Sequence, residues 1–554
     1  MRALRSAAVG CLVAAACLLL AACSGGSPGT TPNTAASSST APPSETTSPS
    51  PTTSTPTGPD AWGPTAAELA QARADVAKLS VRQLAGQLVV ARYSGRSATS
   101  AAHAVTRLHL GGVILFDDNV PSNLVSGLRS SAANVQKAMA DDGRDWPAII
   151  AVDQEGGPVA RVGTPATEFT GAMALGAAAD RTLPAKVGEA SGDELRALGF
   201  TMVFAPDADV TIGSSDPTIG VRSPGSLPET VARVATGLLD GYREAGIVPV
   251  AKHFPGHGSV TANSHVTLPV QRASLETLQS RDFVPFQALV DDSAPAIMVT
   301  HIDVRTLDPG VPSSLSREVI TGQLRDALGF KGLVVTDALD MDAVTEHDTS
   351  SEAAVKAVQA GADVLLMPAD PEAAIDGLAQ AVEKGTITKG RLVESAARTV
   401  ALMRDVAQHP MPPASTVGSN GAVARAVATS STTVVSGPCS GRLVGSAVRV
   451  VGGTSTDRAR FTAAARKAGL RTGSGTLVRL LSTGSSRGSG EVVVALDTPY
   501  GLAQSSASTA RIAAYGRTPS VFAAVMAVLT GHVSALGHLP VKVGSYAIGT
   551  GCPR

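Results

Sequence analysis

The chain has 554 residues, with 45 Lys and Arg against 46 Asp and Glu, and a formal net charge of −1. This balance excludes the strong basicity of a nucleic-acid-binding protein, and 44% hydrophobic with 16% charged residues excludes a wholly disordered chain. The charge is unevenly distributed, because residues 415–554 carry 14 Lys and Arg but 3 Asp and Glu. The length allows one large α/β barrel followed by a smaller domain.

The N-terminus has the features of an export signal. Residues 1–22 begin with two arginines, continue with an apolar stretch from Ala7 to Leu20, and end in small residues before Cys23. The order Leu20-Ala21-Ala22-Cys23 resembles a bacterial lipobox, which predicts that Cys23 is the lipidated first residue of a lipoprotein on the outer face of the cytoplasmic membrane. An ordinary cleaved signal peptide with an incidental cysteine is the alternative.

A polar segment, residues 23–60, follows the signal. Ser, Thr and Pro make up 27 of the 36 residues from Ser24 to Pro59, a composition that is too polar and too often interrupted by proline to form a core. We expect this segment to act as a tether. As a flexible coil it would span roughly 35 Å, and in a polyproline conformation about 110 Å, which would carry a folded domain into the cell wall.

Short apolar or β-branched runs recur beyond the tether, with stretches of helical period between them such as Pro228 to Ala245 and Ser274 to Val290. Eight such runs predict a closed (β/α)₈ barrel over residues 61–410, with an open doubly wound sheet as the alternative. The barrel would hold its active site at the carboxyl ends of the strands. The eight runs are Leu88 to Tyr93, Gly112 to Phe116, Ala148 to Asp153, Thr201 to Pro206, Ile247 to His253, Ala296 to His301, Gly332 to Asp337 and Ala362 to Met367.

Residues 415–554 predict a smaller, basic α/β domain. Strand-like patterns at Leu443 to Val451 and Val492 to Leu496 alternate with helical patterns at Arg458 to Ala468 and Val521 to Thr530. Two further cysteines, Cys439 and Cys552, could form a disulfide in an oxidising exterior, or remain as two free thiols. The excess positive charge could contact an anionic wall polymer, although a soluble stabilising role for the domain is the simpler interpretation.

The most informative segment runs from Ala251 to His265. It contains Lys252-His253-Phe254-Pro255-Gly256-His257-Gly258 and then Asn263-Ser264-His265, so a lysine and three histidines lie at the end of one apolar run and in the loop after it. Such a loop can direct several hydrogen-bond donors onto one ligand. The spacing fits no standard zinc pattern and Lys252 would repel a cation, so we expect no metal site.

This loop resembles the signature of the β-N-acetylhexosaminidase branch of glycoside hydrolase family 3. The resemblance extends from about Ala67 to Met403. It includes further motifs in the same order: Asp153-Gln154-Glu155-Gly156-Gly157, Phe204-Ala205-Pro206, Gly220-Val221-Arg222-Ser223 and Val335-Thr336-Asp337-Ala338-Leu339. It implies a glycosidase on an α/β barrel that needs no cofactor.

The resemblance also implies the catalytic residues. Asp337 corresponds to the nucleophile, and a carboxylate there suits the oxocarbenium-like transition state of a retaining glycosidase. A capping role for this Asp at the start of a helix is the alternative. His265 corresponds to the acid/base on a mobile loop, or would otherwise be a solvated histidine. This chain has Asn263 where the family usually has Asp, which predicts a less basic His265 and slower turnover.

For sugar binding the resemblance implies Asp153, Arg161, Arg222, Lys252 and His253, each of which could instead belong to a structural ion pair. Pro158 and Val221 replace positions that are commonly charged in the family. His257 and His301 are expected to fix loops. Many glucosidase relatives take their acid/base carboxylate from the C-terminal domain, which here offers Asp457, Glu491 and Asp497. The histidine mechanism is favoured over these three.

Together these features predict an exo-acting, retaining β-N-acetylglucosaminidase that is anchored outside the membrane. Its predicted substrates are N-acetylglucosamine-containing saccharides of the cell wall, of the muropeptide type, and no nucleic acid is expected as a partner. Phosphorolysis by the same residues is an alternative reaction. The other alternative is a catalytically weak lipoprotein that binds wall sugar, which Asn263 favours and which Asp337 and His265 oppose.

Overall fold

The computed structural model describes residues 63–178, 180–482 and 487–553. The predicted signal peptide (1–22), the predicted lipidation site Cys23 and the predicted tether (23–60) lie outside the described residues. Within the described ranges, no helix combines the length and the apolar composition that crossing a lipid bilayer requires.

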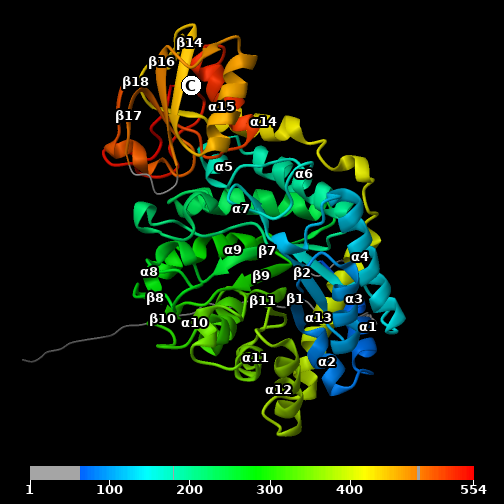
Figure 1. The fold of residues 1–554 in the computed structure, drawn as a ribbon. Helices are drawn as coiled ribbons and strands as arrows, with labels where there is room; N and C mark the ends of the chain where they lie inside the picture. Colours follow the sequence, from blue (N-terminus) through cyan, green and yellow to red (C-terminus); the bar gives the residue numbers. More distant parts are fainter. Residues whose placement is uncertain (1–62, 179, 483–486, 554) are drawn as a thin grey trace, which may run out of the picture. The chain divides into compact units, whose positions relative to one another are not determined.

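Eight parallel strands form the barrel (Figure 1). Each lies within one of the eight predicted runs, except that one strand extends a single residue past the end of its run. They are β1 (Val89–Arg92), β2 (Gly112–Leu115), β3 (Ile149–Val152), β6 (Met202–Val203), β7 (Val248–Phe254), β9 (Ala296–Val299), β11 (Leu333–Thr336) and β12 (Leu365–Leu366). They pair in the order β11-β9-β7-β6-β3-β2-β1-β12. A parallel bridge between Val335 and Val364 joins β11 to the chain entering β12 and closes the barrel, which confirms the predicted fold.

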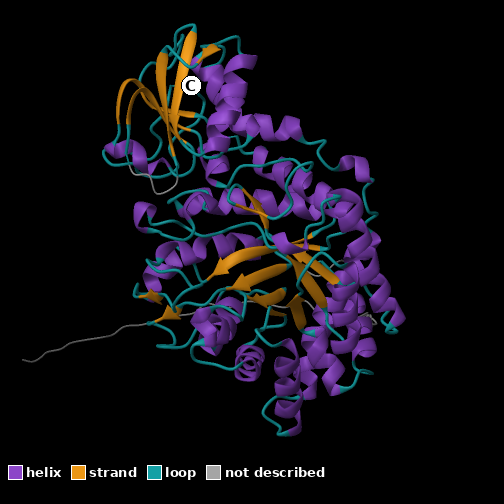
Figure 2. Ribbon diagram, in the orientation of Figure 1, coloured by secondary structure: helices purple, strands orange, loops and turns teal. Residues whose placement is uncertain are grey.

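Helices surround the strands (Figure 2). The helices of the barrel are α1 (Ala66–Val76), α2 (Val81–Gln87), α3 (Ala98–Leu108), α4 (Leu124–Asp141), α5 (Met173–Ala177), α6 (Leu183–Leu198), α7 (Pro228–Glu244), α8 (Leu275–Ser280), α9 (Phe283–Asp291), α10 (Asp342–Thr345), α11 (Ser350–Ala360), α12 (Pro371–Glu383) and α13 (Lys389–Gln408), with a π-helix at Glu318–Ala327. The expected helix from Ser274 to Val290 is two helices, because the chain leaves helical geometry at Arg281 and turns the fully buried Asp282 towards Gly256.

Alternation along the strands separates two apolar layers. In β2 the side chain of Ile114 packs with residues of the barrel interior such as Val250 and Val335, whereas Val113 and Leu115 pack with the surrounding helices. All are buried. Alternate residues of each strand thus face the barrel interior and the helices. The apolar core ends where the strands end, so the residues that follow a strand can be polar.

The smaller domain has a six-stranded sheet in the order β13-β18-β17-β16-β14-β15. Its strands are β13 (Thr433–Ser436), β14 (Ala447–Gly452), β15 (Arg471–Thr472), β16 (Thr476–Leu481), β17 (Ser489–Ala495) and β18 (Ser506–Ala513), and its helices are α14 (Gly421–Ser431), α15 (Ser455–Lys467) and α16 (Pro519–Leu529). All pairs are parallel except β13 with β18. Cys439 and Cys552 form a disulfide across 113 residues.

A buried carboxylate holds the segment before the last barrel strand. Asp363 is fully buried and contacts Arg325, Arg391 and Arg398 at 2.6, 3.1 and 3.1 Å. Burial opposes its ionisation, but the three guanidinium groups hold the pKa of Asp363 well below its ordinary value. Asp363 therefore stays charged in the folded protein and ties β12 to α13 and to the π-helix.

We predict that Asp363→Asn lowers the free energy of unfolding by about 3–5 kcal/mol, because the change leaves buried guanidinium groups without their counter-charge. Denaturant unfolding of the variant and the parent at neutral pH measures this. Asp376→Asn is the matched control: Asp376 pairs with Arg82 on the surface, so its loss should cost less than about 1 kcal/mol. Equal effects of the two substitutions would contradict the structural role of Asp363.

Candidate active site

The carboxyl ends of the barrel strands enclose a cavity of about 310 Å³. This volume is at the small end of the range for ligand-binding sites. Seven of the predicted site residues line it: Asp153, Arg161, Arg222, Lys252, His253, His265 and Asp337. The eighth, Asn263, contacts the side chain of His265. The barrel therefore brings together residues that lie up to 184 positions apart in the sequence.

Asp337 follows β11 and is 7% exposed. One of its carboxylate oxygens, Oδ2, accepts a hydrogen bond from the Thr300 hydroxyl at 2.9 Å, and Oδ1 accepts one from the Ala338 amide at 2.8 Å. Burial opposes ionisation, but His301 and these hydrogen bonds lower the pKa of Asp337 to about 2. Asp337 is therefore an anion at neutral pH, as a carboxylate nucleophile must be.

A compact ion-pair network forms one wall. Lys252 Nζ lies 2.8 Å from Asp153 Oδ1 and 2.7 Å from Glu155 Oε1. Arg222 grips Glu155 with two hydrogen bonds of 2.7 and 2.8 Å. Burial favours the neutral forms, but these pairings raise the pKa of Lys252 and lower that of Glu155, so both stay charged. The network lines the cavity with fixed hydrogen-bond donors and acceptors.

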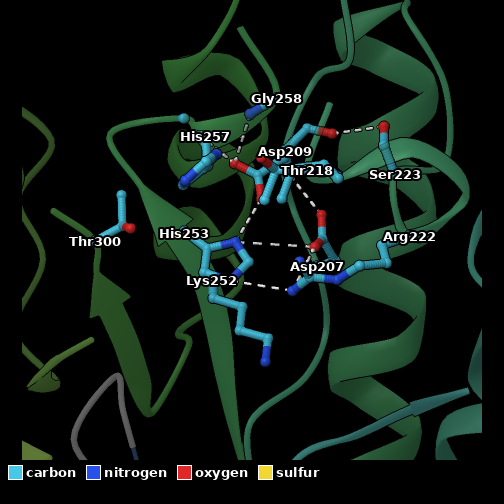
Figure 3. Close-up of polar contacts among 12 residues, drawn as sticks. Asp207, Asp209, Thr218, Arg222, Ser223, Lys252, His253, His257, Gly258 and Thr300 are labelled. Atoms are coloured by element: carbon cyan, nitrogen blue, oxygen red, sulfur yellow. Dashed lines mark hydrogen bonds and ion pairs between the residues drawn. The ribbon is translucent and has the colours of Figure 1, made fainter. Parts of the chain in front are cut away.

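His253 is held from both sides (Figure 3). Its Nδ1 lies 2.6 Å from Asp209 Oδ2, and its Nε2 lies 3.2 Å from the Arg222 guanidinium. Because arginine can only donate, Nε2 accepts and Nδ1 carries the proton, which it donates to Asp209. Burial, together with Arg222 and Lys252, lowers the pKa of His253 well below its ordinary value, so the ring is neutral.

Asp207, Asp209 and His253 place three potential metal ligands within 4.8 Å of one another. Arg222 already supplies a cation there, since its guanidinium lies 3.5 Å from Asp207 Oδ2 and contacts His253. Burial raises the pKa of Asp207 well above its ordinary value, and it raises the pKa of Asp209 to about 7. A metal ion at this place would have to compete with the Arg222 guanidinium and with the protons that the two carboxyl groups readily take up. The cluster is therefore poorly suited to binding a metal ion.

His265 lies in the loop after β7 and borders the cavity. Its Nδ1 is 2.9 Å from Asn263 Oδ1, which also accepts the backbone N–H of His265 at 3.0 Å. Because Oδ1 is an acceptor in both contacts, Nδ1 carries a proton. The other ring nitrogen, Nε2, is thereby the one that can gain or lose a proton.

The two other histidines of this region hydrogen-bond protein groups. His301 Nδ1 lies 2.6 Å from the Ser314 hydroxyl and its Nε2 2.9 Å from the Ala338 carbonyl, and the residue is fully buried. His257 Nε2 lies 3.0 Å from Ser264 Oγ. These contacts are those expected of histidines that fix loops.

The sequence reasoning missed several residues of this site. Glu155 and Asp209 hold sugar-binding candidates in place, and the signal for both was present: Glu155 stands in the Asp153-Gln154-Glu155 motif, and Asp209 follows the fourth strand run. Arg92, Phe116 and Asp340 also line the cavity. The guanidinium groups of Arg92 and Arg161 lie 4.6 and 5.1 Å from the Phe116 ring centre.

The carboxylates of the C-terminal domain have other partners. Asp457 and Asp497 both pair with Arg517, and Glu491 accepts a hydrogen bond from the Leu477 amide. Among the described residues, none of these three acids borders the cavity that holds Asp337.

Comparison with known proteins identifies the family. The family model described as the glycosyl hydrolase family 3 N-terminal domain matches residues 80–402. The chain is 33% identical to β-hexosaminidase A of Pseudoalteromonas piscicida over 329 residues, 55% of each chain. It is 35% identical to the β-hexosaminidase LpqI of Mycobacterium tuberculosis over 338 residues, which cover 59% of this chain and 83% of that one.

Among solved structures, the fold is similar to that of a family 3 β-N-acetylglucosaminidase from Paenibacillus sp. str. FPU-7. The TM-score is 0.76 and the sequence identity is 28%, over 85% of this chain and all of that one. The family model alone covers more than half of the chain. The chain belongs to glycoside hydrolase family 3 and is a glycoside hydrolase.

Proposed function

We propose that this enzyme is an exo-acting β-N-acetylglucosaminidase that removes terminal N-acetylglucosamine from cell-wall saccharides of the muropeptide type, with retention of configuration. The observation that carries the proposal is the ionised Asp337 in a cavity of about 310 Å³ that His265 also borders. The names of the β-hexosaminidase and β-N-acetylglucosaminidase relatives support the choice of sugar. The predicted lipid anchor at Cys23 and the tether support a cell-wall substrate.

In the first step Asp337 attacks the anomeric carbon while the bond to the leaving oxygen breaks. His265, protonated on both nitrogens, delivers its Nε2 proton to that oxygen, so the leaving sugar departs as an alcohol. The products are a glycosyl ester on Asp337 and a neutral His265. Thr300 and the Ala338 amide hold the carboxylate in position for the attack.

In the second step the neutral His265 acts as the base. Asn263 keeps the remaining proton on Nδ1, so Nε2 offers a lone pair to the incoming water. Nε2 removes the water proton as the oxygen attacks the ester-bound carbon, which restores the Asp337 carboxylate and the doubly protonated histidine. Asp153, Lys252 and Arg161 line the cavity and would hold the sugar through both steps.

Phosphorolysis is the second candidate, and Asn263 favours it. A neutral partner for His265 leaves no negative charge on this loop to repel a phosphate anion that would attack in place of water. Asn263 also favours the third candidate, a protein that binds wall sugar with little catalytic activity. The ionised Asp337, oriented by two hydrogen bonds, opposes the binding-only alternative. Hydrolysis remains our proposal over phosphorolysis because the relatives are named as β-hexosaminidases.

We predict that the soluble form lacking residues 1–59 releases the aglycone from a chromogenic N-acetyl-β-glucosaminide, and that Asp337→Asn lowers kcat at least about a thousandfold because it removes the nucleophile. Product analysis with and without phosphate separates the candidates. Free N-acetylglucosamine in both cases supports hydrolysis, and the sugar 1-phosphate would identify a phosphorylase. Sugar binding without any release would make the wall-binding protein the better account.

We also predict that Asn263→Asp speeds turnover and moves the alkaline limb of the kcat/KM profile to higher pH by about one unit or more. A carboxylate against Nδ1 favours the imidazolium form that the first step needs, so that form persists to higher pH. The pH–rate profiles of the variant and the parent measure this. An unchanged rate and profile would show that Asn263 serves as well as a carboxylate.

A further inference from the structure

The loop that carries His265 is attached to the rest of the site through one buried side chain. Asn263 is partly exposed and His265 and Val266 are exposed, but Ser264 between them is 1% exposed. The other hydrogen bonds within residues 261–268 stay inside the loop: the amides of His265, Val266 and Thr267 all donate to Asn263. In the described part of the chain, Ser264 therefore makes the polar contact that reaches out of this loop.

The partner of Ser264 is His257, which is 2% exposed, and the Nε2 to Oγ distance is 3.0 Å. Burial lowers the pKa of His257, so the ring is neutral and carries one proton. Its Nδ1 is buried without a hydrogen-bond partner among the described residues. Burying an N–H group without an acceptor costs more free energy than burying a ring nitrogen without a donor. The proton is therefore on Nε2, which donates it to Ser264 Oγ.

His257 is itself fixed to the sugar-binding wall. Its backbone N–H donates to Asp209 Oδ1, and the Gly258 amide donates to the same oxygen at 3.3 Å. The other carboxylate oxygen of Asp209 holds His253 at 2.6 Å. A continuous series of hydrogen bonds thus runs from His253, which lines the cavity, through Asp209 and His257 to Ser264 beside His265.

We propose that Ser264 is a positioning residue for the acid/base: its hydrogen bond to His257 sets the place of His265 over the cavity. This inference rests on the proposed glycosidase function and adds to it the element that fixes the catalytic loop. Without the bond the loop keeps its internal turn around Asn263 but loses its attachment to the wall. His265 would then spend less time within reach of the leaving oxygen, and displacement of a catalytic group by about 1 Å can cost about a hundredfold in rate.

A residue that acts through the general acid has a distinctive kinetic signature. A phenyl β-N-acetylglucosaminide needs proton donation to its leaving oxygen, whereas a 2,4-dinitrophenyl glycoside departs as a stable anion without it. The parameter kcat/KM reports only the steps up to the first bond cleavage. It should therefore fall for the phenyl substrate and stay nearly constant for the dinitrophenyl substrate when the acid is misplaced.

The experiment measures kcat/KM on both substrates for the parent, His265→Ala, Ser264→Ala, Ser264→Thr and His257→Phe. We expect Ser264→Ala and His257→Phe to lose about ten- to a hundredfold on the phenyl glycoside and no more than about twofold on the dinitrophenyl glycoside. Ser264→Thr keeps the hydroxyl and should recover most of the loss. Combining Ser264→Ala with His257→Phe should add little to either change, because both break the same bond.

Ser395→Ala is the matched control. Ser395 is also fully buried and donates to a side chain, Asp363, at 2.7 Å, but it does not line the cavity. Its loss should lower stability without changing the ratio of the two kcat/KM values. Thermal unfolding of every variant identifies any that fails to fold, and the ratio within each folded variant is independent of the active fraction.

The outcomes separate this inference from the proposed function. If Ser264→Ala loses equally on both substrates, or on neither, the positioning role is overturned. If His265→Ala shows the leaving-group dependence and Ser264→Ala does not, the acid/base assignment stands and only the inference fails. If His265→Ala itself shows no such dependence, the proposed function of His265 is wrong, whatever Ser264 does.

Discussion

Closure of eight parallel strands into one barrel is the constraint on which the site depends. Parallel strands end at the same edge, so residues at the ends of β3, β7 and β11, or just beyond them, meet around one cavity although they are far apart in the chain. The register along the ring and the Val335–Val364 bridge hold these ends in a fixed relation. Asp363, one residue before that bridge, is held by three arginines, so closure is secured by charge as well as by packing.

The balance of charge inside the barrel mouth explains how so many ionisable groups share a buried space. Glu155 lies between Lys252 and Arg222, and each of these cations has a second acidic neighbour. His253 is neutral because it is buried beside the two cations, and it serves as a polar link rather than a charge. Asp337 instead accepts hydrogen bonds from the Thr300 hydroxyl and the Ala338 amide, and the described residues place no lysine or arginine in an ion pair with it.

The strands and the chemistry-bearing loop could be predicted from the sequence because the signals are local. Each strand is a short apolar run, and the motif around Lys252 to His265 lies in one continuous segment. The partners of the site residues could not be predicted in this way. Arg222 pairs with Glu155 and Asp209 contacts His253, and both contacts join residues that are far apart in the sequence. The break between α8 and α9 depends on the burial of Asp282. Such contacts follow from three-dimensional packing, which periodicity does not encode.

Trapping of the covalent intermediate tests the central claim most directly. Incubation with 2-acetamido-2-deoxy-5-fluoro-β-glucosyl fluoride should let the first step proceed and slow the second, so that a glycosyl group accumulates on the enzyme. Intact-mass measurement followed by peptide mapping would locate it. The account predicts one added sugar on the peptide that contains Asp337. A label on a different carboxylate, or turnover of substrate with retention of configuration but no label at all, would contradict it.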